Sequence, residues 1–478
     1  MAALSRILSE LEHDSKPRLL GVEAPLGGPA ISGRQWSAAA TSIAQTLLTM
    51  DTQHRRFNGR IAVCSDNPYQ LILMATACLK AGMTFQPISP RWPIDQRGSL
   101  MRSMQSTACW PSKAFMPSDH ILHVDINIEE LVAQSHTIAP QAQHVSCTTL
   151  LTSGSTGTPK AVEHSFEQHL AAAQFCNPIL NLSKRSCWLM SLPIYHAAGY
   201  SIFMRCLAAG ATIALQQQRS LTIEDFELHS VTHASLVTTQ LKRLLELRHF
   251  NSAHLTLRHI MVGGGPVSDE LVLTATERGF KVYLSYGMTE TAAAIALSEV
   301  KTHAGIDVSN NRNLKLHDDE IWLRGSQIAQ SYLTWSEHIT LTDAQGWFAT
   351  GDTGEVIDDH LFIVGRKDNQ FISGGENIQP ELIERALLLH PSIQNAVVVP
   401  VADSEFGARP AAYILWKESP VAIEQLKAAL SKTLPRFMFP SHWFEWPALA
   451  QDQKPPRKLW AELAEQQLVA LNRSSYAR

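Results

Sequence analysis

The sequence of 478 residues has no apolar run long enough to cross a membrane and no excess of charge of one sign. A membrane-spanning helix needs about 20 consecutive apolar residues, and the start of the chain, Met1–Glu12, is amphipathic and acidic, unlike a secretion signal. The 40 Lys and Arg are dispersed among 44 Asp and Glu, without the basic cluster that a nucleic-acid partner favours. We therefore expect a cytoplasmic globular protein with no membrane span and no nucleic-acid partner.

Paired cysteine motifs are also absent. The seven cysteines are odd in number and contain no Cys-x-x-Cys pair, so they do not indicate a zinc site or a dithiol redox motif. A catalytic cysteine is disfavoured, because none of the seven sits beside a base in a special turn. We expect reduced, mostly buried thiols.

The length and the order of apolar runs predict two domains. The chain exceeds the size at which single cores stop growing. From about Arg60 onward, short apolar runs alternate with helical patterns, which predicts βαβ units and a parallel sheet. Closely spaced strands over 320–363 predict a β subdomain. We expect an α/β fold, with a large N-terminal domain of parallel α/β sheets over 1–367 and a small α+β C-terminal domain over 368–478.

The run Thr152–Lys160 is the most informative stretch of the chain. Its glycines allow backbone conformations that turn successive N–H groups inward, and its hydroxyls and terminal lysine suit a polyphosphate. The ordinary hydrolase loop, Gly-x4-Gly-Lys-Ser/Thr, is not matched, and a solvated Gly/Ser turn is the alternative interpretation. The candidate phosphate-binding residues are Thr152, Ser153, Gly154, Ser155, Thr156, Gly157 and Lys160.

Two further candidate residues, Thr289 and Glu290, follow a predicted strand over Lys281–Leu284. Ligands of open α/β sheets collect at the carboxyl ends of parallel strands, and a carboxylate there can hold Mg²⁺ on ATP phosphates. The alternative is that Glu290 is a first-turn acid of a helix over Thr291–Leu297.

Two glycine-containing turns are further candidates for ligand binding. Gly263, Gly264 and Gly265 follow the strand that ends at Val262, where missing side chains would let a ring or a substrate approach. Asp352 lies between two glycines in Thr350–Glu355 and can accept hydrogen bonds from both hydroxyls of a ribose. Arg366 can pair with phosphate or ribose. Plain turns are the alternative in each case.

Taken together, these stretches resemble the adenylate-forming superfamily of acyl-CoA synthetases, luciferases and peptide-synthetase adenylation domains. The matching motifs occur in that superfamily's order, at Thr152–Lys160, Leu192–His196, Tyr286–Glu290, Thr350–Glu355 and Gly365–Glu384. Within the superfamily, Leu189–Pro193, Thr232–Leu241, Phe371–Pro380 and Val399–Gly407 are most similar to the o-succinylbenzoate–CoA ligases of menaquinone biosynthesis. The resemblance implies that Mg-ATP adenylates a carboxylate, releasing pyrophosphate, and that the thiol of CoA then displaces AMP.

The resemblance also implies roles for nucleotide-binding residues. The phosphate loop would hold the β- and γ-phosphates, Thr289 the α-phosphate, Glu290 the Mg²⁺, and Asp352 with Arg366 the ribose. Gly264 and Gly265 would flank the acyl and adenine pockets, beside the nucleotide-binding Tyr286 and Gly287. The superfamily's catalytic lysine usually lies in Gly-Lys-x-x-Arg; here Lys454 precedes Arg457 at that spacing without the glycine, with Lys458 as the alternative and a solvated lysine as the third option.

The resemblance also implies residues that bind the acid substrate and residues that act when CoA reacts. His196 matches the gate of the acyl pocket and is also a catalytic candidate, while a satisfied core histidine is the alternative. Arg205 interrupts an apolar helix and must snorkel or meet a partner. With Ser235 it matches the ligase positions that would bind the aryl carboxylate, and Gly263 lies beside them. Asp368 matches the hinge of a mobile C-terminal domain that would bring Gly374 and Gly375 to the acyl end.

The sequence provides no carrier domain with a phosphopantetheine serine, so we expect free CoA as the thiol. Two other functions stay open: a ligase for another aryl or medium-chain acid, and a non-catalytic nucleotide-binding scaffold. The oligomeric state is open as well, with a homodimer among the options.

Overall fold

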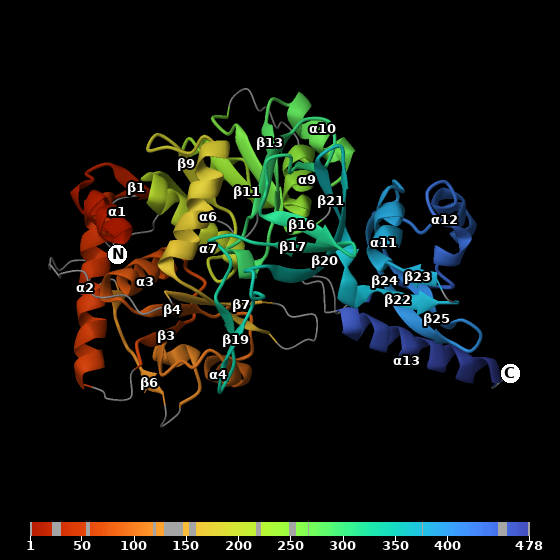
Figure 1. The fold of residues 1–478 in the computed structure, drawn as a ribbon, viewed down its shortest axis with the longest axis horizontal. Helices are drawn as coiled ribbons and strands as arrows, with labels where there is room; N and C mark the ends of the chain where they lie inside the picture. Colours follow the sequence, from red (N-terminus) through yellow and green to blue (C-terminus); the bar gives the residue numbers. More distant parts are fainter. Residues whose placement is uncertain are drawn as a thin grey trace. The chain divides into compact units, whose positions relative to one another are not determined.

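The computed structural model describes residues 2–21, 30–53, 58–117, 121–128, 147–152, 159–216, 221–247, 255–265, 267–374, 376–447 and 457–476. These residues form two compact units (Figure 1). The larger unit draws on residues 1–152, 159–313 and 323–348, and the smaller on 314–322 and 349–478. The predicted boundary at Asp368 lies inside the smaller unit and stays a prediction.

The first sheet of the larger unit has the order β14-β13-β12-β11-β9-β10-β1-β2. Strands β10, β9, β11, β12 and β13 run parallel to their neighbours, as the βαβ pattern predicted, and β14 pairs antiparallel to β13. The strands are β1 (Pro17–Leu20), β2 (Ala30–Ser32), β9 (Cys187–Met190), β10 (Thr212–Leu215), β11 (His233–Val237), β12 (His259–Gly263), β13 (Lys281–Tyr286) and β14 (Ala296–Val300).

The second sheet has the order β19-β18-β8-β7-β4-β3-β5-β6. Strands β7 and β8 form an antiparallel pair, and β18 joins the far side of β8. The strands are β3 (Arg60–Val63), β4 (Thr84–Pro87), β5 (Ala108–Trp110), β6 (Leu122–His123), β7 (Thr148–Leu151), β8 (Ala161–His164), β18 (Ser331–Leu333) and β19 (His338–Thr340). Strands β18 and β19 fall within the predicted β subdomain over 320–363, so that prediction was wrong for these two strands.

One apolar core joins both sheets to the helices α1 (Ala2–His13), α2 (Gly33–Gln53), α3 (Pro68–Ala81), α6 (Phe166–Ile179) and α7 (Ala197–Ala209). Local sequence sets the helix ends. Asn67 caps α3 by accepting from the N–H groups of Tyr69 and Gln70, and Gly82 ends α3 in the left-handed conformation. None of the described helices is both long and apolar enough to span a bilayer.

The alternative interpretation of Glu290, as a first-turn acid of a helix over Thr291–Leu297, was wrong. A short 3-10 turn, η3 (Thr289–Thr291), is followed by β14. The Thr291 hydroxyl bonds to the backbone N–H and carbonyl of Met288, which competes with helical hydrogen bonding. Ala292 and Ala293 then adopt positive φ angles of 51° and 90°, which end the helical path.

The smaller unit contains the strands β21-β20-β17-β16 in that order. The hairpins β16 (Leu314–His317) to β17 (Glu320–Leu323) and β20 (Phe348–Ile357) to β21 (His360–Arg366) each turn through two aspartates at positive φ, Asp318–Asp319 and Asp358–Asp359. Such two-residue turns match the twist of paired strands. These strands confirm the rest of the predicted β subdomain.

The C-terminal part of the smaller unit is α+β, as predicted. Its sheet β24-β25-β26 packs helices on both faces, with α11 and α12 on one core and α13 on another. Figure 1 shows α13 lying along this sheet. The elements are α11 (Pro380–Leu388), β24 (Ile393–Asp403), β25 (Gly407–Trp416), α12 (Ile423–Leu430), β26 (His442–Glu445) and α13 (Arg457–Tyr476).

The cysteines have the state predicted from the sequence. All seven are free and buried. Burial raises the pKa of the Cys109 and Cys187 thiols to about 12, so these thiols stay protonated and unreactive near neutral pH.

Candidate active site

Several predicted residues gather at the carboxyl edge of the first sheet. Val237 at the end of β11 pairs in register with Gly263 at the end of β12, and Val262 pairs with Leu284 of β13. The segment Tyr286–Glu290 follows from the same edge, as the strand pattern predicted. Ligands of open α/β sheets bind at such edges.

Glu290 is mostly buried, with 9% of its surface exposed. Its carboxylate accepts a hydrogen bond of 2.7 Å from the hydroxyl of Tyr332 on β18, and its carbonyl accepts from the N–H of Ala329 at 2.8 Å. No cluster of three or more His, Cys, Asp or Glu side chains occurs among the residues that the structure describes. A single carboxylate fits Mg²⁺ that is held mainly by phosphates and water.

Lys160 lies close to the same tyrosine. Its Nζ is 4.8 Å from the centroid of the Tyr332 ring, within cation–π range. The N–H of Thr152 donates to the carbonyl of Lys160 at 2.9 Å, so the two ends of the predicted phosphate loop meet on the β7–β8 pair. The loop residues Ser153, Gly154, Ser155, Thr156 and Gly157 lie outside the described residues.

Tyr332 was missed by sequence reasoning. It lies far along the chain from both groups that it contacts, and only the pairing of β18 with β8 brings it there. An aromatic residue in a short strand gives no local signal of such a contact.

Close packing explains the glycines at this edge. A Cβ on Gly287 would lie 1.6 Å from the carbonyl oxygen of Ala293, and one on Gly263 would lie 2.5 Å from Oγ of Ser285. Gly264 has a positive φ of 79°, whereas a Cβ on Gly265 would meet nothing within 4 Å. The backbone at Gly265 is therefore open to a ligand. The Tyr286 side chain is buried.

His196 precedes α7 at its amino end and is exposed. Desolvation by its surroundings and the nearby Arg91 cation lower its pKa, which favours the neutral ring. The loop Leu192–His196 packs tightly on α7, because a Cβ on Gly199 would lie 2.1 Å from the carbonyl oxygen of Pro193. His196 is thus a solvent-facing residue and not a satisfied core histidine.

Arg205 on α7 is buried, with 2% of its surface exposed. Its guanidinium lies over the Trp188 ring at 5.4 Å, and its Nε has no hydrogen-bond partner. Within the described residues it forms no ion pair with a carboxylate. A buried cation without a counter-charge is costly, so this arrangement points to an anionic partner outside the chain.

Ser235 on β11 is also buried, and its hydroxyl has no partner in the described structure. Alternate residues of a strand share a face, so Ser235 lies on the same face as His233. The His233 ring stacks on Trp188 at 5.3 Å, and Trp188 carries Arg205. Arg205 and Ser235 therefore share one face of the first sheet. Trp188 was missed by sequence reasoning because its apolar strand gave no other signal.

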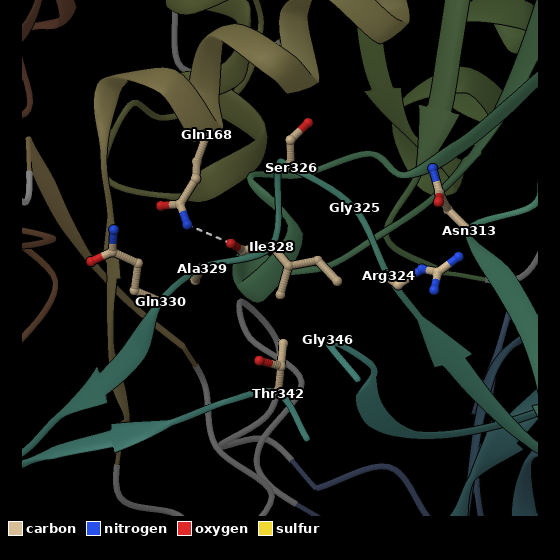
Figure 2. Close-up of a pocket in the computed structure, with 10 residues that line it drawn as sticks. All are labelled: Gln168, Asn313, Arg324, Gly325, Ser326, Ile328, Ala329, Gln330, Thr342 and Gly346. Carbon is tan, nitrogen blue, oxygen red and sulfur yellow. Dashed lines mark hydrogen bonds between the residues drawn. The ribbon is translucent and has the colours of Figure 1, made fainter. Parts of the chain in front are cut away.

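A polar cleft of about 540 Å³ lies in the larger unit (Figure 2). Ala329, whose N–H bonds to the Glu290 carbonyl, lines this cleft, and the Gln168 amide donates to the Ile328 carbonyl at 2.5 Å. Arg324, Gln330 and Thr342 also line the cleft (Figure 2). No predicted site residue is among its lining residues.

In the smaller unit, Asp352 and Arg366 face each other across β20 and β21. Nη1 of Arg366 donates to Oδ1 of Asp352 at 2.8 Å and to the carbonyl of Thr350 at 3.1 Å, and Asp368 lies 3.6 Å from Nη2. The structure thus brings the two predicted ribose residues together.

The second glycine loop joins β22 (Phe371–Ser373) to β23 (Glu376–Ile378). Gly374 has a φ of 59° and donates its N–H to the carbonyl of Phe406 at 2.9 Å. A Cβ there would lie 2.8 Å from the Phe406 ring, so only glycine fits without rearrangement. Gly375 lies outside the described residues.

Lys454 also lies outside the described residues, but the chain just after it is firmly held. Nη1 of Arg457 donates to Oε1 of Glu384 at 2.6 Å and to the carbonyl of Val398, and Nη2 lies 3.2 Å from Oε1 of Glu381. The alternative lysine, Lys458, is exposed on the first turn of α13.

The chain belongs to the AMP-binding enzyme family. The family model matches residues 21–333, and the model of the AMP-binding enzyme C-terminal domain matches residues 382–453. The predicted superfamily, fold and enzyme class are thereby confirmed.

Individual proteins within this family are similar to the chain over most of its length. The 2-succinylbenzoate–CoA ligase of Escherichia coli is 35% identical over 386 residues, which cover 80% of this chain and 82% of that protein. An arginine-to-lysine variant of E. coli MenE with bound OSB-AMS has a TM-score of 0.81 at 28% identity, covering 97% of this chain and 98% of that one. The Bacillus subtilis o-succinylbenzoate CoA synthetase in complex with the acyl-adenylate OSB-AMP has a TM-score of 0.81 at 25% identity, covering 95% and 97%.

Proposed function

We propose that this chain is an ATP-dependent 2-succinylbenzoate–CoA ligase, the o-succinylbenzoate–CoA ligase of menaquinone biosynthesis. In the first half-reaction, the succinyl carboxylate attacks the α-phosphorus of ATP and pyrophosphate leaves. In the second, the CoA thiol attacks the acyl carbonyl of the adenylate, and AMP leaves as the thioester forms. Similarity to ligases of this name over most of the chain supports the proposal.

The observation that carries the choice of acid is that Arg205 is buried and forms no ion pair with a carboxylate among the described residues. 2-Succinylbenzoate has two carboxylates, and the aryl carboxylate is not activated. Arg205 would bind that carboxylate, with the unpartnered Ser235 hydroxyl as a further donor. A fatty acid would leave the guanidinium buried without a counter-charge, which disfavours a medium-chain substrate.

The motif residues suggest how the nucleotide would be held. Lys160 and Thr152 with Ser153–Gly157 would hold the β- and γ-phosphates, Thr289 the α-phosphate, and Asp352 with Arg366 the ribose. Glu290 would hold Mg²⁺, which supplies charge neutralisation on the phosphates when bound. Tyr286, Gly287, Gly264 and Gly265 would line the adenine and acyl sides, and His196 would stand at the acyl entrance.

The smaller unit would act in both half-reactions. Lys454 would bridge the substrate carboxylate and the α-phosphate oxygens during adenylation. Rotation about Asp368 would then withdraw Lys454 and bring Gly374 and Gly375 to the acyl end, where CoA arrives. We place the reaction in the cytoplasm, with no nucleic-acid partner. A homodimer is one option for the oligomeric state.

The decisive assay is pyrophosphate release with ATP, Mg²⁺ and CoA. The acids are 2-succinylbenzoate, 4-oxo-4-phenylbutanoate, benzoate and octanoate; the second lacks only the aryl carboxylate. We expect turnover with 2-succinylbenzoate, and Arg205→Ala should lower its kcat/KM by about a hundredfold or more, because one partner of a buried charge pair is lost.

The analogue without the aryl carboxylate is the matched control. Arg205→Ala should leave its kcat/KM nearly unchanged. Equal losses of kcat/KM with both acids would contradict the role of Arg205. Faster turnover of octanoate or benzoate would show that 2-succinylbenzoate is not the preferred substrate. Nucleotide binding without turnover of any acid would favour a non-catalytic scaffold.

A further inference from the structure

Tyr332 lies between two groups that the proposed function assigns to ATP and its metal ion. Its hydroxyl donates to Oε1 of Glu290 at 2.7 Å, and its ring lies 4.8 Å from Nζ of Lys160. One half-buried side chain thus contacts both the carboxylate and the ammonium group. Its position limits how far apart these two charges can move.

The backbone of Tyr332 is held by the second sheet. Tyr332 pairs with Val162, and its neighbour Ser331 pairs with Glu163. Glu163 is buried, forms an ion pair with Arg60 at 2.7 Å, and has its Oε2 2.7 Å from Nδ1 of His338. The strand pairing and a hydrogen bond of 3.3 Å from the Ser331 hydroxyl to Oε2 of Glu163 join β18 to β8, whose first residue directly follows Lys160. Tyr332 is therefore fixed by protein contacts that do not involve Glu290.

We propose that Tyr332 is a positioning residue that orients the Glu290 carboxylate toward the nucleotide-bound metal ion and steadies Lys160 beside the phosphates. This inference rests on the proposed function. A hydrogen bond to one carboxylate oxygen restricts the rotation of the group, so metal binding does not have to order it. The ring face offers Lys160 a weak electrostatic contact that keeps its Nζ near the loop end.

The test is calorimetric binding of a non-hydrolysable ATP analogue at a series of Mg²⁺ concentrations. Tyr332→Phe keeps the ring and removes the hydroxyl, so the half-saturating Mg²⁺ concentration should rise about tenfold, the usual cost of losing a ligand's orienting partner. Its affinity for the metal-free nucleotide should stay unchanged. Tyr332→Leu should also weaken metal-free binding, about threefold, because the contact with Lys160 is lost.

Tyr283→Phe is the matched control. Tyr283 is a buried tyrosine on β13, before the strand ends at Tyr286, and its hydroxyl lies 3.1 Å from Nδ1 of His259. It should leave the Mg²⁺ dependence unchanged. The same shift in both Phe variants would overturn the inference, as would no shift in Tyr332→Phe.

A double-mutant cycle separates positioning from general structural damage. If Tyr332 acts through Glu290, adding Tyr332→Phe to Glu290→Gln should produce no further change in the Mg²⁺ dependence. Fully additive shifts would overturn the inference. The assay contains neither acid nor CoA, so a different acid substrate would not affect it, whereas no nucleotide binding by the wild type would overturn the proposed function and this inference together.

Discussion

Arg205 in the larger unit and Arg457 in the smaller unit are both largely buried, yet their surroundings differ. Arg457 is surrounded by acceptors, with Glu384, Glu381 and the Val398 carbonyl all in contact. Arg205 has an aromatic ring and no carboxylate among the described residues. A satisfied arginine anchors its own chain, whereas an unsatisfied one indicates a ligand that completes the charge balance.

The largest expected effect is a difference in the free energy of unfolding between variants of these two arginines. Arg457→Met should lower the free energy of unfolding of the smaller unit by about 3 kcal/mol, because it leaves buried Glu384 without its counter-charge. Chemical denaturation monitored in that unit measures the change.

Arg205→Met is the matched variant in the larger unit. Its free energy of unfolding should stay within about 1 kcal/mol of the wild-type value or exceed it, because the substitution removes a buried charge that has no carboxylate partner among the described residues. Equal destabilisation by the two variants would contradict the comparison.

The next effect concerns Lys454, which precedes Arg457 in the sequence and is proposed to act in adenylation. Lys454→Ala should slow adenylation by about a hundredfold to a thousandfold, the usual cost of losing one group that stabilises transition-state charge. It should spare capture of a preformed acyl-adenylate by CoA. Single-turnover assays of each half-reaction check this, with Lys458→Ala as the control. Equal loss in both half-reactions would remove Lys454 from this role.

The smallest effect concerns His233, which lies beneath the Trp188–Arg205 contact. Burial lowers the pKa of His233 to about 4, so the folded state binds this proton less readily than the unfolded state. His233 should therefore contribute about 1 kcal/mol to the stability that the larger unit loses between pH 7.5 and 5.5, because protonation below the unfolded pKa favours unfolding. Denaturation of the wild type and His233→Gln at both pH values measures it, and an equal pH dependence in the variant would contradict the assignment.

The sequence predicted those features that depend on neighbouring residues. Short stretches of sequence were enough to predict the parallel strands and the position of Thr289 and Glu290 after β13. They also showed that Arg205 places a charge within an apolar helix. The contact of Tyr332 with Glu290 could not, because it depends on the pairing of β18 with β8 across much of the chain.

The alternative interpretation, a helix over Thr291–Leu297, failed for a local reason. Helical propensity favoured the alanines that follow Thr291, but its hydroxyl bonded to Met288 and the next two residues took positive φ angles. The resemblance implied that Asp352 and Arg366 both bind the ribose, but the local sequence did not indicate that they pair with each other. Their pairing depends on the register of the hairpin through Asp358–Asp359.

The β7–β8 pair has a consequence for how the enzyme could be altered. Leu151 pairs with Ala161, and Thr152 bonds to Lys160, so the chain leaves and re-enters the sheet at adjacent points. A segment with joined ends can change in length at a small entropic cost, roughly 0.6 kcal/mol for each doubling. A change in the number of residues between Thr152 and Lys160 should therefore cost the β7–β8 pairing little stability.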